Sequence, residues 1–354
     1  MYSGRTNVNK FIIEQAQANP ALAGDFAALI SDVVRACKTI AHAVARGELG
    51  RVTESSNDSE PRQRLARLAN DAFLRHCEWG GHLAGMASKA LDGPYLIPQE
   101  YPRGKHLLVF DPIDGYLNTD VNISVGSIFS VLRCADGIET PTHEDFLQPG
   151  TRQVAAGYAL YGPATMFVLT VGTGVFGFTL DPELGEFILT HPRMSIAEDT
   201  REVSVNMSNE RFWEKPVQRY VRECMTGQAG VRGADFNMRW IASLVADMHR
   251  IFLRGGVFLY PRDSRDAGRI GRLRLMFEAN PIALLVEQAG GMASTGRCRV
   301  LDLHPRELHE RGPVIFGSRN EVCRLLRYHA EADSGEDEPF TSPLFGTRSL
   351  FITT

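Results

Sequence analysis

The sequence of 354 residues lacks three features that would place it in a special class of proteins. It has no apolar run of membrane-spanning length, its first residues MYSGRTNVNK hold no long apolar segment, and its six cysteines include no C-x-x-C pair. A surplus of basic residues is also missing, because the net charge is -4. These absences predict a soluble cytoplasmic protein that does not bind nucleic acid and has neither a zinc site nor a disulfide framework.

The composition, with 44% hydrophobic and 23% charged residues, is that of an ordinary globular protein long enough for two domains. Apolar residues recur at helical spacing from Asp25 to Ala45, and a second helix is expected over residues 64–77. Between Gln153 and Thr190, short runs rich in Val, Phe, Tyr and Thr alternate with Gly and Pro, which predicts an antiparallel meander. The fold class that follows is α/β, with a second domain beginning near residue 200.

Two carboxylates, Asp111 and Asp114, lie in a short turn between two apolar runs, and we expect the chemistry at this place. The run LLVF before them predicts a buried strand, which Pro112 is expected to end because it has no N–H to donate. Gly115 lets the backbone approach a ligand, and the two carboxylates with the carbonyl of Ile113 form a cluster of hard oxygens that suits Mg²⁺ or Mn²⁺. The alternative is an ordinary Asp-Pro turn without a function.

Basic residues gather in one part of this acidic chain. Residues 231–275 contain nine Arg and four Asp with no Lys or Glu, a local balance of +5. Arginine rows suit bidentate recognition of phosphate, so this region is a candidate phosphate site, and a solvated helix face is the alternative.

Several motifs together resemble one known family. The turn FDPIDG is similar to the metal-binding FDPLDG turn of the class I fructose-1,6-bisphosphatases, and the segments RWIASLVADMHRIFLRGGVFLYP and GRLRLMFEANPIALLVEQAGGMASTGR resemble its C-terminal half. GHLAGMAS and VIFGSRNEV look most like the bacterial branch of that family. The resemblance covers nearly the whole chain.

The resemblance implies a two-domain, layered α/β/α/β/α fold that assembles as a homotetramer. It places an N-terminal domain at residues 1–198, a C-terminal domain at 199–332, and an acidic linker with a tail at 333–354. The family's substrate is a phosphorylated sugar whose 1-phosphate is hydrolysed with the help of several Mg²⁺ ions.

The resemblance also implies roles for individual residues. The positions that match metal ligands are Asp111, the carbonyl of Ile113, Asp114 and Glu278. The positions that match substrate-binding residues are Gly115, Tyr116 and Leu117 at the 1-phosphate, Arg274 beside it, Asn206, Tyr260 and Arg272 at the 6-phosphate and sugar, and Arg239, which reaches into the neighbouring subunit.

The chain departs from the family pattern at the chemistry itself. Lys89 and Ala90 stand where the family has two metal-binding glutamates, and Ala66 stands where it has an aspartate that helps activate water. Tyr116 and Leu117 replace two serines that seat the 1-phosphate, so bulk takes the place of small hydroxyl donors.

Charge counting suggests that these departures belong together. Six family carboxylates with two Mg²⁺ sum to -2, and three carboxylates with the ammonium of Lys89 give the same sum. Since unpaired buried carboxylates are costly, we expect Lys89 to replace a cation and to repel Mg²⁺. At most one ion is then expected on Asp111, Asp114 and Glu278.

Three hypotheses follow for the function. In the first, the chain binds a phosphorylated sugar or related ligand, and Lys89 with Asp111, Asp114 or Glu278 performs cofactor-free acid/base chemistry such as elimination, isomerisation or cyclisation. In the second, it is a non-catalytic sugar-phosphate sensor or a subunit that partners an active paralogue. In the third, it is a genuine fructose-1,6-bisphosphatase that uses Mg²⁺ or Mn²⁺.

Overall fold

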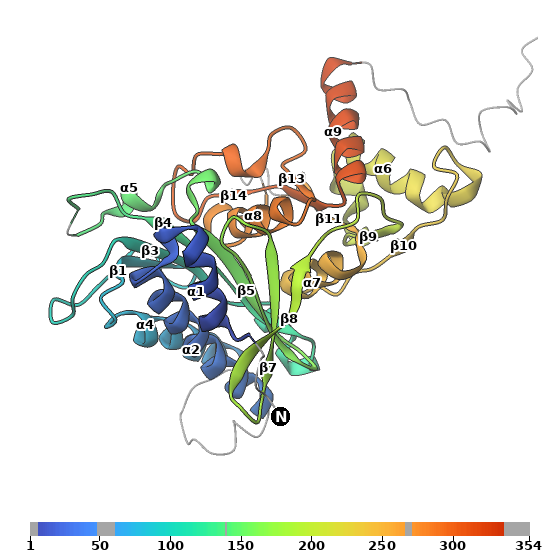
Figure 1. Cartoon of the computed structure of the whole chain (residues 1–354). Helices are drawn as coiled ribbons and strands as arrows, with labels where there is room; N and C mark the ends of the chain where they lie inside the picture. Colours follow the sequence, from blue (N-terminus) through green and yellow to red (C-terminus); the bar gives the residue numbers. More distant parts are fainter. Residues whose placement is uncertain (1–5, 48–60, 139, 266–270, 336–354) are drawn as a thin grey trace, which may run out of the picture.

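The computed structural model describes residues 6–47, 61–138, 140–265 and 271–335. Its elements form five stacked layers, helix, sheet, helix, sheet and helix (Figure 1). The expected α/β/α/β/α architecture is therefore confirmed. The expected acidic linker and tail lie outside the described residues, apart from the few that end the last helix.

The larger sheet has eight strands in the order β2-β1-β3-β4-β5-β6-β7-β8. Only β1 and β3 pair in parallel, and the later strands form the predicted antiparallel meander. The strands are β1 Leu83–Ser88, β2 Tyr95–Leu96, β3 His106–Asp114, β4 Val125–Arg133, β5 Ala155–Tyr161, β6 Thr165–Thr170, β7 Val175–Asp181 and β8 Glu186–Met194.

Three helices cover one face of this sheet, drawn in blue in Figure 1. They are α1 Val8–Ala18, α2 Asp25–Arg46 and α4 Pro61–Cys77, and a one-turn helix, α5 His143–Phe146, follows β4. The apolar stripe of α2 is buried together with the sheet side chains, as its helical spacing predicts. Both predicted N-terminal helices are confirmed.

Two further helices, α7 Leu244–Arg254 and α8 Asn280–Gln288, separate the larger sheet from a five-stranded sheet of order β10-β9-β11-β15-β13. The outer face of the second sheet carries α6 Lys215–Thr226 and α9 Arg319–Ser334. The remaining strands are β9 Glu202–Ser204, β10 Asn237–Met238, β11 Val257–Tyr260, β13 Met292–Ser294 and β15 Val314–Gly317, and a separate ribbon pairs β12 Leu273–Arg274 with β14 Arg311–Gly312.

The prediction that Pro112 ends its strand is wrong. Strand β3 continues through Pro112 to Asp114, and its pairing with β4 shifts register between Asp111 and Asp114. A proline is tolerated at such an irregularity because the ladder hydrogen bond that it cannot donate is already interrupted there. The irregularity thus delivers both carboxylates at the end of one buried strand.

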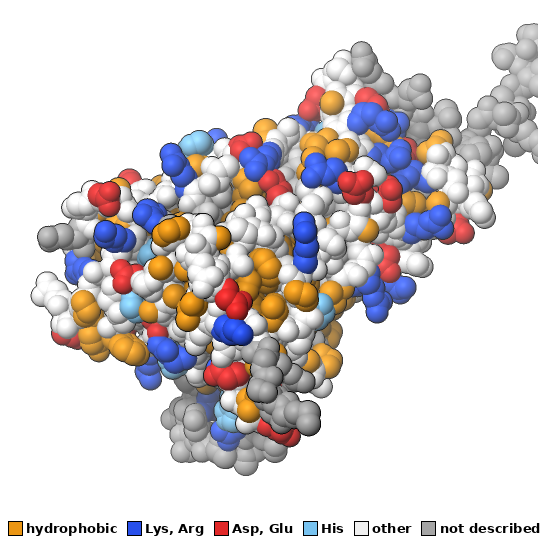
Figure 2. Space-filling view, viewed as in Figure 1, with side chains coloured by type: hydrophobic (Ala, Val, Ile, Leu, Met, Phe, Trp, Pro, Cys, Tyr) orange, Lys and Arg blue, Asp and Glu red, His pale blue; other side chains and the backbone are white. Residues whose placement is uncertain are grey.

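Acidic and basic side chains are interspersed on the face shown in Figure 2, where blue and red side chains lie among each other. This distribution agrees with the small net charge of -4. Within the described part of the chain, none of the helices is long and apolar enough to cross a membrane.

A buried histidine between α7 and the larger sheet is expected to make stability fall in mild acid. The ring of His249 meets the hydroxyl of Tyr158 at 2.8 Å, and burial, with a smaller contribution from His191, lowers its pKa to about 4. In the unfolded chain this histidine has its ordinary pKa of about 6.5, so below that pH the unfolded state binds a proton that the folded state does not bind. The neutral imidazole therefore contributes roughly 3 kcal/mol to the free energy of unfolding. This contribution is complete above pH 6.5 and is lost as the pH falls towards 4.

Urea unfolding at pH 7.5 and pH 4.5 tests this expectation with His249→Gln, which keeps a hydrogen-bonding group but does not titrate. The variant should lose less stability between the two pH values than the wild type does. His42→Gln, at an exposed position of α2, serves as the control and should retain the wild-type difference. If His249→Gln retained it as well, the buried imidazole would not be the source.

Candidate active site

The parallel pairing of β1 with β3 places Lys89 beside Asp111. Ser88 lies opposite Phe110 in this pairing, and the amide of Lys89 donates to the carbonyl of Phe110 at 3.0 Å. The next residue along each strand direction, Lys89 after Ser88 and Asp111 after Phe110, therefore lies at the same edge of the sheet. Lys89 directly follows β1 and Asp111 lies within β3, so hydrogen-bonded backbone holds both side chains in place.

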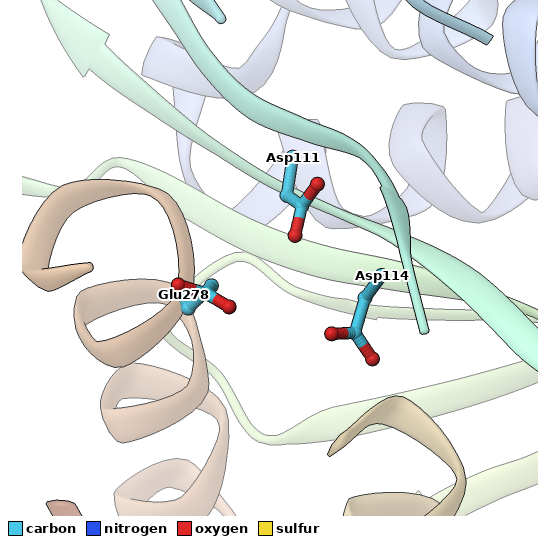
Figure 3. Close-up of side chains that lie close together, drawn as sticks. All are labelled: Asp111, Asp114 and Glu278. Atoms are coloured by element: carbon cyan, nitrogen blue, oxygen red, sulfur yellow. The ribbon is translucent and has the colours of Figure 1, made fainter. Parts of the chain in front are cut away.

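Three carboxylates gather at this edge. Asp114 is the last residue of β3 and Asp111 lies shortly before it, while Glu278 comes from the π-helical turn η6, Leu275–Ala279, which leads into α8. One oxygen from each lies within 4.8 Å of the others, and all three residues are buried. Figure 3 shows them pointing towards one another, two from the strand and one from the helix. The sequence-predicted carboxylates are thus brought together.

The ammonium of Lys89 enters this cluster. Its Nζ lies 2.6 Å from Asp111 Oδ2 and 3.0 Å from Glu278 Oε1, so it bridges two of the three acids. The side chain of Lys89 is 27% exposed, whereas those of Asp111 and Glu278 are 2% and 5% exposed. The expected pairing of Lys89 with the acids is present.

Burial and charge shift the proton affinities of these groups. Burial alone would lower the pKa of Lys89, but Asp111 and Glu278 outweigh it and hold that pKa above its ordinary value. Burial raises the pKa of Asp111 against the opposing effect of Lys89, and burial raises the pKa of Asp114 to about 7. Lys89 is therefore a charged group at neutral pH, and Asp114 is a group able to exchange a proton near neutrality.

Hydrogen bonds from other elements fix the acids. The amide of Val245, at the start of α7, donates to Asp114 Oδ2 at 3.1 Å. The amide of Arg274 donates to Glu278 Oε2 at 2.7 Å. The amide of Ile113 lies close enough to Asp111 to oppose the rise in its pKa, and the carbonyl of Ile113 as a ligand stays a prediction.

The residues after Asp114 form the rim of the site. Gly115 has φ +75°, a left-handed conformation that favours glycine, and a Cβ added there would lie 3.2 Å from the hydroxyl of Ser243. Tyr116 and Leu117 open a short 3-10 helix, η2 Tyr116–Val121, and are 36% and 58% exposed. Their bulk therefore lies at the surface next to the acids rather than filling the buried cluster.

A second hollow lies in the C-terminal half. Asn206 and Tyr260 line it together with Trp213, Trp240 and Asp263. The rings of Trp240 and Tyr260 meet edge to face, with 6.2 Å between their centroids. Two predicted substrate-binding residues thus share one pocket, whose aromatic walls were not among the sequence predictions.

The predicted arginines lie at different places. Arg274 donates from Nη1 to the carbonyl of Lys89 at 2.6 Å, so it borders the acidic cluster. Arg272 is exposed, and its charge adds to the hydrogen bond from Arg265 in lowering the pKa of Asp263, which places it beside the aromatic pocket. Arg239 is 52% exposed, and its Nε lies 3.6 Å from Glu202.

The +5 segment is not a single phosphate-binding surface. Arg232 and Arg250 pair with Glu321 and Glu202, two acids outside the segment, so part of the local charge surplus is neutralised inside the fold. Arg239, Arg272 and Arg274 stay the predicted phosphate-binding arginines, although Arg239 also lies 3.6 Å from Glu202.

Sequence reasoning missed Arg311 and His309, which lie near Arg274 at the border of the acidic cluster. Burial, together with the charge of Arg311, lowers the pKa of Arg274. His309 contacts the carbonyl of Leu91 at 2.8 Å from Nε2. Their place depends on the two-residue ribbon of β12 and β14, which is too short to leave a periodic signal in the sequence.

The donor set fits a hard divalent cation, because three converging carboxylates are the ligands that Mg²⁺ and Mn²⁺ prefer. Asp111, Asp114 and Glu278 would hold one such ion, which would polarise a phosphoryl oxygen. Lys89 lies between two of these ligands, so the fit requires its side chain to turn away.

Comparisons with known proteins agree with this geometry. The chain matches the family descriptions "Fructose-1-6-bisphosphatase, N-terminal domain" over residues 6–192 and "Fructose-1-6-bisphosphatase, C-terminal domain" over residues 196–330. It is 57% identical over 349 residues to "Fructose-1,6-bisphosphatase class 1" of Hydrogenophilus thermoluteolus, covering 97% of this chain and 96% of that protein. "Fructose-1,6-bisphosphatase class 1 3" of Methylibium petroleiphilum is 53% identical over 352 residues, with 98% of each chain covered.

A solved structure shares the fold. The holo form of Leishmania major fructose-1,6-bisphosphatase superposes with a TM-score of 0.83 at 35% identity, covering 92% of this chain and 99% of that chain. The resemblance found in the motifs is confirmed over nearly the full length. The chain therefore belongs to the class 1 fructose-1,6-bisphosphatase family.

Proposed function

We propose that this chain hydrolyses the 1-phosphate of fructose 1,6-bisphosphate, which is the third of the hypotheses raised by the sequence. The observation that carries the proposal is the 57% identity to a relative named for this activity over 97% of the chain. Three carboxylates and a bordering arginine at the place of the family's chemistry support it.

The residues of the chain divide the work between two places. Asn206, Tyr260 and Arg272 bind the 6-phosphate end and orient the sugar, because amide, hydroxyl and guanidinium groups donate to phosphate oxygens. Arg274 draws the 1-phosphate towards the acidic cluster. The buried carboxylates are held by backbone amides, so the cluster is organised before the substrate arrives.

The first hypothesis, cofactor-free chemistry by Lys89, has no support from the relatives. A lysine that accepts a proton as general base must be neutral, and the two carboxylates that hold Lys89 favour its charged form. The second hypothesis, a sensor or a partner of a paralogue, stays a prediction. The homotetramer and the role of Arg239 across a subunit boundary stay predictions from the resemblance, and the cytoplasmic location stays a prediction from the sequence.

Phosphate release from fructose 1,6-bisphosphate by the purified chain, with Mg²⁺ and then Mn²⁺, tests the proposed function. Tyr260→Phe should raise KM about 10- to 100-fold with kcat little changed, because it removes one hydrogen bond to a charged phosphate. Tyr95→Phe is the control and should leave KM unchanged. It removes a hydroxyl on the edge strand β2 that donates to Glu78. A wild type that releases no phosphate above background would refute the proposal.

A further inference from the structure

We propose that Lys89 is a built-in counter-ion that holds the cation position among Asp111, Asp114 and Glu278, so that a divalent ion binds only by displacing it. The inference deepens the proposed function because it concerns the same acidic cluster, although its test does not depend on turnover. It assigns Lys89 as the residue that sets the metal affinity of this site.

The position of the ammonium carries the argument. Nζ of Lys89 lies 2.6 Å from Asp111 and 3.0 Å from Glu278, and these two acids are also candidate ligands of the ion. An ion held by the same oxygens would stand within a few ångströms of the ammonium, and two like charges at that separation repel strongly in a partly buried site. Lys89 and the ion therefore exclude each other.

The backbone around Lys89 is fixed, so its side chain is aimed at the cluster rather than falling there by chance. The amide of Lys89 donates to the carbonyl of Phe110 at 3.0 Å, and the carbonyl of Lys89 accepts from Arg274 Nη1 at 2.6 Å. Ser88, the preceding residue, donates its hydroxyl to Asn70 at 2.6 Å and accepts the amide of Ala90 at 3.1 Å.

The same contacts show how displacement works. The side chain of Lys89 is 27% exposed, so the ammonium has a route to solvent that does not require the backbone to move. Its long flexible stem can swing outward while the hydrogen bonds of the main chain remain. An ion at sufficient concentration then replaces one positive charge by two.

Electron paramagnetic resonance of free Mn²⁺ measures this competition directly. The wild type, Lys89→Met and Lys38→Met are titrated with Mn²⁺ alone, without substrate. Lys38 is the matched control because its side chain is also 27% exposed and pairs with one acid, Glu186, at 3.4 Å. We expect Lys89→Met to bind Mn²⁺ about 10²- to 10³-fold more tightly than the wild type, and Lys38→Met to resemble the wild type.

Thermal unfolding gives a second readout. Lys89→Met should melt below the wild type in EDTA, because three buried carboxylates lose their cation, and millimolar Mn²⁺ should restore its melting temperature.

A wild-type affinity for Mn²⁺ within threefold of the affinity of Lys89→Met would overturn the inference. Tight Mn²⁺ binding by the wild type, abolished by Asp111→Asn, would also overturn the inference. This comparison decides the matter even if Lys89→Met fails to fold.

The outcomes separate this inference from the proposed function. If the wild type hydrolyses fructose 1,6-bisphosphate and binds Mn²⁺ tightly with Lys89 in place, the proposed function stands and the inference about Lys89 is refuted. If Lys89→Met shows the predicted gain of Mn²⁺ affinity but the wild type releases no phosphate, the inference stands and the proposed function is refuted.

Discussion

A variant carrying Ala66→Asp, Lys89→Glu, Ala90→Glu, Tyr116→Ser and Leu117→Ser is expected to release phosphate from fructose 1,6-bisphosphate at least about 10²-fold faster than the wild type at saturating Mg²⁺. The first three changes add carboxylates and remove the ammonium that lies 2.6 Å from Asp111. The two serines restore hydroxyl donors at the 1-phosphate end. Each gain acts on the transition state, so kcat should rise.

The structure favours this experiment because none of the five positions is in the buried core. Ala90 and Leu117 are exposed, and Ala66, Lys89 and Tyr116 are partly exposed or at the surface. New polar side chains at Ala90, Tyr116 and Leu117 cost little stability. Ala66 packs against the core and Lys89→Glu removes the cation of three buried carboxylates, so we expect a lower melting temperature without Mg²⁺ and its recovery when Mg²⁺ binds. The melting temperature in Mg²⁺ therefore checks folding before the assay.

A matched variant keeps Lys89 and carries the other four changes, Ala66→Asp, Ala90→Glu, Tyr116→Ser and Leu117→Ser. It should stay close to the wild-type rate, because the ammonium still holds the cation position between Asp111 and Glu278. Phosphate release is followed under identical Mg²⁺ concentrations for all three proteins. If the wild type already turned over at an ordinary rate of about 1 to 10³ per second and the five changes added nothing, the replacements would be neutral for hydrolysis.

The sequence alone predicted the helices and the meander because their signals are local. The helical spacing over Asp25–Ala45 agrees with α2, and the strand-length runs between Gln153 and Thr190 agree with β5 to β8. Pro112 was misread because proline was judged by its missing N–H alone. The register shift that makes the proline tolerable depends on β4, which lies later in the chain.

The acidic cluster shows what local reasoning cannot supply. Asp111 and Asp114 were found from one turn, but Glu278 entered only through the resemblance, because a glutamate at the start of a buried helix has no distinctive spacing. The contact between Lys89 and Asp111 follows from the parallel register of β1 and β3, which a single sequence does not encode in any nearby pattern. The local charge of the Arg-rich segment has the same limit, since the acids that neutralise Arg232 and Arg250, Glu321 and Glu202, lie far away in sequence.

Removing the charge of Arg232 is expected to destabilise the fold by about 3 to 5 kcal/mol. Its guanidinium lies 2.5 Å from Glu321 between α6 and α9, and the two side chains are only 4% and 7% exposed. Glu321 also accepts the hydroxyl of Tyr220 at 2.6 Å, so the carboxylate is tied into the interface of the two helices. Arg232→Leu therefore leaves a buried negative charge without its cation, and urea unfolding measures the loss.

An exposed pair of the same chemistry provides the control. Arg222 lies 2.7 Å from Glu210, but these side chains are 45% and 32% exposed, so Arg222→Leu should cost at most about 1 kcal/mol. Comparable losses in both variants would contradict the argument from burial.

The double variant Arg232→Leu with Glu321→Gln separates the unpaired charge from lost packing. Glutamine keeps an acceptor for Tyr220 and has no charge, so the double variant should recover most of the stability that Arg232→Leu loses. If the stability stayed at the level of the single variant, the cost would lie instead in the guanidinium's packing over Phe236, whose ring centroid is 4.3 Å away. Arg232→Met, which restores an unbranched apolar stem, would then recover what Glu321→Gln did not.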